Sequence, residues 1–319
     1  MIRVAASLLL CLFAGAAWSQ PYPSKPIRLI VPFVPGGNVD ITARTVAPAL
    51  GEALGQPIVV ENRPGAAGMV GAQALMAGGA DGYTLMMGSN SSLAVAPNLY
   101  ANWPYDPVKG IAPISNLAVT PFVLVVKPAL PAKTLEEFLK VARENPGRLA
   151  MASGGNGSSN HLVGELFQMM TGAKFSHVPY KGTGAALVDL AGGQVDLLFD
   201  QASSTVPNVR GGKIRAIAVA SRARQAALPD TPTFAEAGVK DFEIENFTGL
   251  VGPAGMPADA VAKVHDAAVK ALATPVVKER FASLGVQPVG NTPEQWGAEI
   301  RTDMARWAKV IKAANITVQ

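Results

Sequence analysis

Short apolar runs alternate with helical patterns along almost the whole chain, and this alternation constrains the fold more than any other feature. Several of the runs are apolar on both faces, which is typical of strands that helices cover on each side. The candidate strands are Ile27–Val31, Ile58–Val60, Thr84–Met87, Phe122–Val126, Arg148–Ala152, Val195–Phe199, Ile214–Ala220 and Phe247–Val251. The pattern predicts an α/β protein with largely parallel sheets.

The segments between the strands have the periodicity of amphipathic helices. Apolar faces are formed by Ala43, Val46, Ala47, Leu50 and Leu54 in the first helix, and by Leu162, Leu166, Phe167 and Met170 in a later one. Capping-box pairs, Thr134 with Glu137 and Thr292 with Gln295, indicate two helix starts. The chain is predicted to end in helices at Ala258–Ala273, Pro275–Leu284 and Pro293–Ala314, with Phe281, Trp296 and Trp307 in the core.

The first 20 residues predict a secretory signal peptide. Arg3 supplies the positive charge, Ala5–Ala14 is a short apolar run, and Ala17-Trp18-Ser19 is a small-x-small cleavage signal. The run is too short to span a bilayer. Cys11 could instead mark a lipid anchor, but the residue before it is not small, so this is the weaker interpretation. Cleavage after Ser19 would leave a mature chain of 300 of the 319 residues.

The composition excludes several classes of protein. Cys11 is the only cysteine, so the mature chain has no disulfide and must be held together by its core, for which 300 residues are ample. Few histidines and no clustered carboxylates argue against a metal site, and we expect no cofactor. The balance of 27 basic and 23 acidic residues, with no basic run, gives little support for nucleic-acid binding. The length favours two lobes.

The first predicted strand is followed by a glycine turn, Pro35-Gly36-Gly37-Asn38-Val39-Asp40, which begins a helix. Glycines let backbone N–H groups approach a ligand, and the helix directs its free N–H groups and positive dipole end to the same place. This is a candidate anion site. The alternative is a tight strand-to-helix turn with Asn38 or Asp40 as its cap.

A second polar turn follows the strand at Arg148–Ala152. It contains Gly155, Asn156, Gly157, Ser158, Ser159 and His161. It lacks the Gly-Lys-Ser/Thr ending of a phosphate loop and the spacing of a dinucleotide site. Ser158 or Ser159 with His161 could form the nucleophile and base of a hydrolase, but no acid is placed by the sequence to orient the histidine, and the G-x-S-x-G elbow is missing.

Further polar tips follow other strands. They contribute Ser89, Tyr180, Lys181, Gly182, Thr183 and Asp200, while His177 and His265 have no partner by spacing and are expected at the surface or in packing. In open α/β sheets, ligands bind beyond the carboxyl ends of the strands. The first and second glycine turns would then be the jaws of a cleft, one from each lobe. Neither turn contains an arginine, so the cleft suits a carboxylate bound partly through water.

Seven ordered motifs resemble one family. They are VPFVPGGNVDITAR, ENRPGAAG, ADGYTLMMG, YDPVKGIAPIS, SGGNGSSNHL, HVPYKGTGAALVDLAGGQVDLLFD and LPDTPTFAEAG. Across nearly the whole mature chain, they are similar to the Bug-type periplasmic receptors of tripartite tricarboxylate transporters. The resemblance implies a two-lobed, type II-like Venus-flytrap fold that closes on a carboxylate-bearing solute and delivers it to membrane permease subunits. It assigns ligand-binding roles to Pro35, Gly36, Gly37, Asn38, Asp40, Ser89, Gly155, Asn156, Gly157, Ser158, Ser159, His161, Tyr180, Gly182, Thr183 and Asp200.

We therefore expect a monomeric solute-binding protein rather than an enzyme. Residues 20–120 and 221–319 would form the first lobe and residues 121–220 the second, with hinge strands near Leu117–Val126 and Ile214–Ser221. The ligand would be a small organic acid, and the sequence leaves open a dicarboxylate, an aromatic acid, an amino acid or a neutral amide. Two other functions stay open, a periplasmic serine hydrolase and a ligand sensor for a membrane signalling protein.

Overall fold

The computed structural model describes residues 21–106, 108–313 and 316–317. The predicted signal peptide, its cleavage site and the predicted helix end at Ala314 lie outside these residues. In the described part of the chain, no helix has both the length and the apolar character that crossing a membrane requires.

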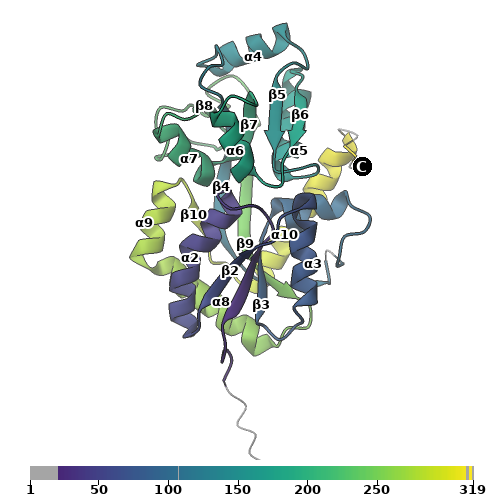
Figure 1. The fold of residues 1–319 in the computed structure, drawn as a ribbon, viewed down its shortest axis with the longest axis vertical. Helices are drawn as coiled ribbons and strands as arrows, with labels where there is room; N and C mark the ends of the chain where they lie inside the picture. Colours follow the sequence, from purple (N-terminus) through teal and green to yellow (C-terminus); the bar gives the residue numbers. More distant parts are fainter. Residues whose placement is uncertain (1–20, 107, 314–315, 318–319) are drawn as a thin grey trace, which may run out of the picture.

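Two sheets form the two lobes of an α/β fold and share one long strand, β4 (Ile111–Val126). The first sheet contains β1 (Ile27–Val31), β2 (Ile58–Asn62), β3 (Thr84–Ser89), β9 (Glu245–Pro253) and β10 (Gln287–Pro288). The second contains β5 (Ala150–Ser153), β6 (Ser176–Pro179), β7 (Leu197–Gln201) and β8 (Arg215–Val219). The strand order is β2-β1-β3-β9-β4-β7-β5-β6. Figure 1 shows one lobe above the other, connected by β4.

The expectation of largely parallel sheets is wrong for the strands at the hinge. β1 pairs in parallel with β2 and β3, and β5 with β6 and β7, but β4 and β9 run antiparallel to every neighbour. The reason is topological. β4 enters the second lobe from the side on which the parallel strands of that lobe end, and β9 returns to the first lobe in the opposite sense. The carboxyl ends of both parallel sets therefore face the space between the lobes.

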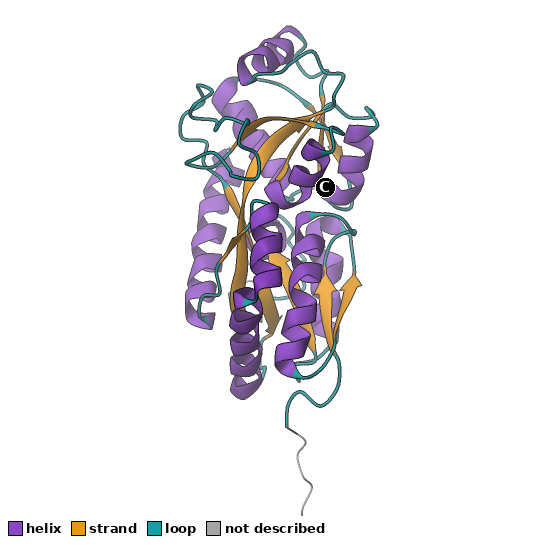
Figure 2. Cartoon of the chain, turned by 90° about the vertical axis from the view of Figure 1, so that its left-hand side faces the viewer, coloured by secondary structure: helices purple, strands orange, loops and turns teal. Residues whose placement is uncertain are grey.

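Helices cover both faces of the sheets (Figure 2). Those beside the first sheet are α2 (Asn38–Leu54), α3 (Met69–Ala77), α8 (Ala258–Ala273), α9 (Pro275–Ser283) and α10 (Pro293–Ala313), and those of the second are α4 (Leu135–Glu144), α5 (Ser159–Thr171), α6 (Thr183–Ala191) and α7 (Ala202–Arg210). Short turns of helix follow β2 and β3, namely η1 (Ala66–Gly68), η2 (Asn90–Val95) and η3 (Ala96–Asn98). In β1, Ile27, Leu29 and Val31 face one core cluster and Ile30 the other, as a strand covered on both sides requires.

Most local predictions about the helices are confirmed. The capping boxes at Thr134 and Thr292 form, and Phe281, Trp296 and Trp307 are buried. Met170 is an exception, because it is 43% exposed rather than part of the apolar face. It lies in the last turn of α5, one residue before the helix ends at Thr171.

The second hinge strand differs from its prediction. The segment Ile214–Ser221 contains β8, which pairs only with the second-lobe half of β4. The chain then packs Phe234 and Phe242 against Phe167 of the second lobe, with ring centroids 5.8 Å and 5.6 Å from it. It returns to the first sheet at Glu245, opposite Pro121. The connecting strand is thus β9, because the residues after β8 bury their aromatic side chains before the chain returns.

Candidate ligand site between the lobes

A small cavity lies where the two lobes meet. It is lined by Phe33, Gly37, Asn38, Val39, Ser89, Ser91 and Asn246 from the first lobe, and by Gly154, Asn160, Thr183 and Gln201 from the second. The space open to the centre of a water molecule is about 20 Å³. A cavity of that size has room for about one water. The lobes are therefore closed on one another.

Helix N-termini from both lobes approach each other at this cavity. α2 begins after Gly37 and α6 after Gly182, and neither terminus has a side-chain cap. A Cβ atom at Gly37 would lie 3.1 Å from Thr183 Oγ1 and 3.5 Å from the Gly184 nitrogen. The first N–H groups of a helix have no partner within it and carry its positive dipole end. Two such ends side by side repel one another unless an anion or a polar group lies between them.

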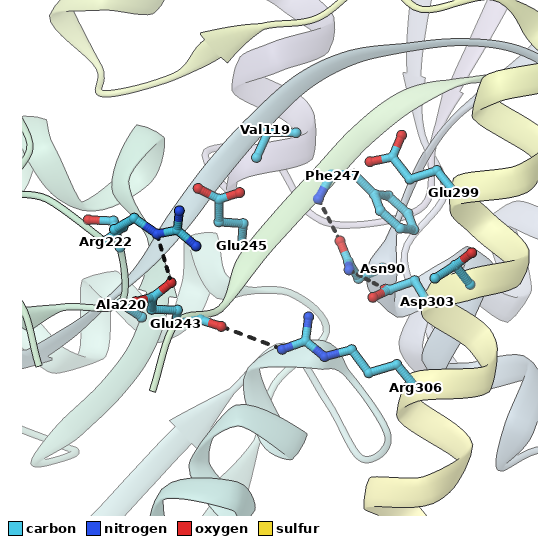
Figure 3. Close-up of a pocket in the computed structure, with 12 residues that line it drawn as sticks. Asn90, Val119, Ala220, Arg222, Glu243, Glu245, Phe247, Glu299, Asp303 and Arg306 are labelled. Carbon is cyan, nitrogen blue, oxygen red and sulfur yellow. Dashed lines mark hydrogen bonds and ion pairs between the residues drawn. The ribbon is translucent and has the colours of Figure 1, made fainter. Parts of the chain in front are cut away.

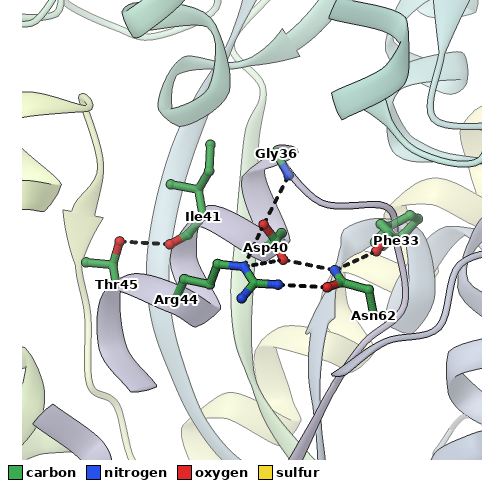
Figure 4. A network of polar contacts seen from close by, with 7 residues as sticks. All are labelled: Phe33, Gly36, Asp40, Ile41, Arg44, Thr45 and Asn62. Carbon is green, nitrogen blue, oxygen red and sulfur yellow. Dashed lines mark hydrogen bonds and ion pairs between the residues drawn. The ribbon is translucent and has the colours of Figure 1, made fainter. Parts of the chain in front are cut away.

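The first turn is held from within its own lobe by Asp40 (Figure 4). The buried Asp40 carboxylate accepts hydrogen bonds from the Gly36 N–H (3.0 Å), Arg44 Nε (3.0 Å) and Asn62 Nδ2 (2.9 Å). Arg44 also donates to Asn62 Oδ1 at 2.8 Å. The carboxylate does not line the cavity, and it holds the turn in which Gly37 does. Gly36 has φ +85°, a conformation that favours glycine.

Asn38 also uses its side chain within the protein. Its Nδ2 donates to Thr248 Oγ1 (2.9 Å), and its Oδ1 accepts from Ser203 Oγ (2.6 Å) on α7 of the opposite lobe. The expected cap by Asn38 or Asp40 is absent, because the N-cap position is Gly37 and makes no side-chain cap. The N–H groups at the start of α2 consequently stay available at the cavity.

The second glycine turn is arranged differently from its prediction as a jaw. Its helix, α5, is capped, because Ser158 Oγ accepts from the His161 N–H (3.3 Å) and Ser91 Oγ, from the first lobe, accepts from the Ser159 N–H (2.9 Å). The Tyr100 hydroxyl donates to the Asn156 carbonyl at 2.9 Å. Asn156 itself is exposed. Two helices of the second lobe begin without a side-chain cap, α6 after Gly182 and α7 after Gln201, and the N-terminus of α6, which lies against Gly37, is the one opposed to α2.

The histidines form a stacked pair beneath the second turn. The rings of His161 and His177 lie 3.9 Å apart at 6°, so His177 is a packing residue, which is one of the two alternatives expected from the sequence. His161 Nδ1 accepts from the Gly157 N–H (3.3 Å), and His177 Nε2 lies 2.6 Å from Ser153 Oγ. The other ring nitrogen of His161 lies 3.7 Å from Glu165. In the described chain neither serine hydroxyl hydrogen-bonds to the His161 ring, and the hydrolase arrangement is not assembled.

Burial lowers the pKa of His161 to about 3 and that of His177 to about 4, and the neighbouring His177 contributes to the lowering at His161. The unfolded chain binds protons below the ordinary value of 6.5, while the folded pair does not. Stability should therefore fall as the pH decreases from about 6.5 to about 4. Urea unfolding at about pH 7 and about pH 5 should show that the double variant His161→Gln/His177→Gln loses less stability on acidification than the wild type.

The comparison with the wild type is needed because Asp200 and Asp303 act in the opposite direction. Burial raises the pKa of each to about 6, so the folded state binds their protons more readily and gains stability below that pH. If the free energy of unfolding changes with pH in the double variant as it does in the wild type, the histidine pair does not control acid stability.

Asp200 lies beneath the cavity rather than in it. It is fully buried, and its carboxylate accepts from Ser204 Oγ (2.7 Å) and Asn160 Nδ2 (3.2 Å), which connects α5 with α7. Tyr180 is half-buried and donates its hydroxyl to Asp189 (2.6 Å) within its own lobe. Lys181 is exposed. None of these three side chains lines the cavity.

The structure thus divides the predicted site residues into two groups. Gly37, Asn38, Ser89 and Thr183 line the cavity, whereas Pro35, Gly36, Asp40, Gly155, Asn156, Gly157, Ser158, Ser159, His161, Tyr180, Gly182 and Asp200 surround or support it. The lining residues missed by the sequence prediction are Phe33, Val39, Ser91, Gly154, Asn160, Gln201 and Asn246. Gly154, Asn160 and Ser91 belong to the recognised turns, and Gln201 follows Asp200 at a strand end. Asn246 lies at the start of a strand, where no local signal indicates a site.

A larger cavity of about 500 Å³ lies at the hinge (Figure 3). Its carboxylates include Glu245, Glu299 and Asp303, and Asp303 accepts hydrogen bonds from Asn90 Nδ2 (2.5 Å) and Trp307 Nε1 (3.0 Å). The four carboxylates outnumber the two arginines of the lining, Arg222 and Arg306, so its charge disfavours an organic acid and size alone does not make this cavity the candidate site. Asn90 Oδ1 accepts from the Phe247 N–H (2.6 Å), and Asn90 therefore connects the turn after β3 to β9 and α10.

The chain is similar to known proteins in sequence and in fold. Residues 42–316 match the family described as tripartite tricarboxylate transporter family receptor. The chain is 38% identical to protein BugT of Bordetella pertussis over 300 residues, which cover 94% of this chain and 92% of BugT. It superposes on a solved periplasmic transporter with TM-score 0.91 and 44% identity, covering 93% and 100% of the two chains. Rhodopseudomonas palustris MatC with bound malate gives TM-score 0.86 and 33% identity, covering 91% and 100%.

Proposed function

Because the chain belongs to the tripartite tricarboxylate transporter receptor family and is a periplasmic solute-binding protein, we propose that its solute is a small organic acid whose carboxylate is held between the N-termini of α2 and α6. The opposed, uncapped termini carry this proposal. No lysine or arginine is among the residues that line the cavity, so N–H groups, hydroxyl groups and helix dipoles would balance the charge. MatC, a relative of similar structure, has malate bound.

The size of the cavity implies that the lobes open to admit the acid and then close around it. About 20 Å³ does not admit an organic acid, so the lobes must separate before the ligand enters. Three neutral contacts across the lobes would break on opening, Ser91–Ser159, Asn38–Ser203 and Tyr100–Asn156. Neutral hydrogen bonds contribute about 0.5–1.5 kcal/mol each. Contacts of this strength let the lobes open and close readily, so that ligand binding can shift the equilibrium between the two forms, as a flytrap requires.

The remaining expectations also stay proposals. We propose that the signal peptide directs export, that permease subunits receive the closed form, and that the receptor acts as a monomer. The division into lobes is proposed with one change, because strand pairing favours a second boundary near residue 244 rather than 220. In the described chain neither Ser158 nor Ser159 hydrogen-bonds to the His161 ring, which removes the geometric support for the hydrolase alternative.

The proposal is tested by identifying and titrating the ligand. Native mass spectrometry of the freshly purified protein should show a bound mass that corresponds to a small acid. Calorimetry with that acid should give at most about a threefold loss of affinity for Lys181→Ala, because the lysine is exposed and its side chain does not line the cavity. A neutral ligand, or a hundredfold loss in this variant, would contradict the dipole-held carboxylate.

A further inference from the structure

Four residues with carboxamide side chains line the cavity, and two of them, Asn246 and Gln201, lie outside the recognised glycine turns. Asn246 is at the start of β9 in the first lobe, and Gln201 ends β7 in the second. Their exposed fractions are only 1% and 4%. Asn246 Oδ1 is buried and has no hydrogen-bond donor among the described residues. In the same part of the chain, the side-chain amide of Gln201 makes no hydrogen bond, while the backbone carbonyl of Gln201 accepts from the Ser204 and Thr205 hydroxyl groups.

The orientation of the Asn246 amide is fixed by its neighbours. Nδ2 donates to the Phe247 carbonyl at 2.9 Å and to Thr248 Oγ1 at 3.3 Å. A carbonyl cannot donate, so flipping the amide would replace a hydrogen bond by repulsion. Thr248 Oγ1 is also the acceptor for Asn38 Nδ2. The free atom at Asn246 is therefore an acceptor, and a molecule in the cavity must supply its donor.

The residues that line the cavity restrict which chemical group can donate to Asn246 Oδ1. A carboxylate cannot donate, and a hydrocarbon chain would leave the buried oxygen unsatisfied, which is costly. An ammonium group would need a counter-charge, but the cavity lining contains no Asp or Glu. A hydroxyl group can donate to Asn246 Oδ1 and accept from the amide of Gln201 across the cleft. Because the cavity is small, this hydroxyl must be close to the carboxylate.

We propose that Asn246 and Gln201 are specificity-determining residues that recognise a hydroxyl group beside the carboxylate, so that the receptor prefers 2-hydroxy acids to the same acids without the hydroxyl. This inference rests on the proposed function and narrows the class of its ligand. Each residue comes from a different lobe, and both contacts form only when the lobes close. Recognition of the hydroxyl is thereby coupled to closure.

Matched pairs of acids test this inference by calorimetry on the wild type. The pairs are L-malate and succinate, lactate and propionate, and mandelate and phenylacetate, which differ only by the hydroxyl. In the pair that fits the cavity, the hydroxylated acid should bind at least about tenfold more tightly. Equal binding within every pair, or preference for the acid without the hydroxyl, would overturn the inference and leave the proposed function intact. Binding of none of the six acids would overturn both.

The variants Asn246→Leu and Gln201→Leu assign the preference to these residues. Each should weaken binding of the hydroxy acid by about tenfold or more and change binding of its partner by less than about threefold. Gln194→Leu, at an exposed glutamine outside the cavity, is the matched control and should bind like the wild type. If both variants still prefer the hydroxylated acid, the assignment of this preference to Asn246 and Gln201 is overturned. If a variant fails to fold, the comparison of the acid pairs on the wild type still tests the inference.

Discussion

Replacing Gly184 by alanine is expected to abolish ligand binding while leaving each lobe folded. Gly184 is the second residue of α6, and a Cβ atom there would collide with the carbonyl oxygen of Pro35 and lie 3.2 Å from the Gly37 nitrogen. All of these neighbours are backbone atoms of the opposite lobe, so no side-chain rotation can make room. The clash exists only in the closed form, and the loss of affinity should exceed about a hundredfold.

The free energy of unfolding of Gly184→Ala should rise, although its affinity for the ligand falls. Alanine is favoured over glycine within a helix by about 0.5–1 kcal/mol, and the open form has space for the methyl group. Gly192→Ala is the matched control at the other end of α6, where the nearest atom to a new Cβ is the Val188 carbonyl at 3.5 Å. It should bind normally. Calorimetry and small-angle scattering decide the result, because Gly184→Ala should keep its open radius at any ligand concentration. Normal affinity in this variant would contradict the proposed closure.

Replacing Asp40 by alanine is expected to lower the free energy of unfolding by about 2–4 kcal/mol and to weaken ligand binding by at least about tenfold. Three donors lose their acceptor, including the Gly36 N–H and the Asn62 side chain. Arg44 is half-exposed and can be hydrated, which limits the cost of its lost ion pair. Binding suffers because the turn that places Gly37 at the cavity is no longer held.

Urea unfolding and calorimetry on the same samples distinguish a structural role of Asp40, which is to hold the turn, from direct contact between Asp40 and the ligand. Asp81→Ala is the control, since Asp81 forms an exposed ion pair with Lys25 at 3.6 Å and should contribute less than about 1 kcal/mol. The double variant Asp40→Ala/Asn62→Ala should lose less stability than the sum of the single variants. A binding loss without any loss of stability would instead make Asp40 a ligand contact.

The sequence alone was sufficient for the fold class, the positions of most strands and helices, and the turns around the cavity. The reason is that these features depend on local patterns. The apolar run of β1, the glycines before α2 and the Thr134 capping box each lie within a few residues of the structure they specify. The ordered motifs added the family, which the comparison with known receptors confirms.

The tertiary structure alone decided which polar groups face the ligand cavity. Asp40 and Asn246 both lie next to strands or turns, yet one is turned into a network with Asn62 and the other lines the cavity. His161 stacks on His177, 16 positions along the chain, and Asn38 bonds to Ser203, 165 positions away. Side-chain direction depends on neighbours that folding brings together, and local periodicity does not encode them. For the same physical reason, the sequence did not reveal that α5 is capped and α6 is not: the N-terminus of α5 is closed by Ser91, a residue from the other lobe.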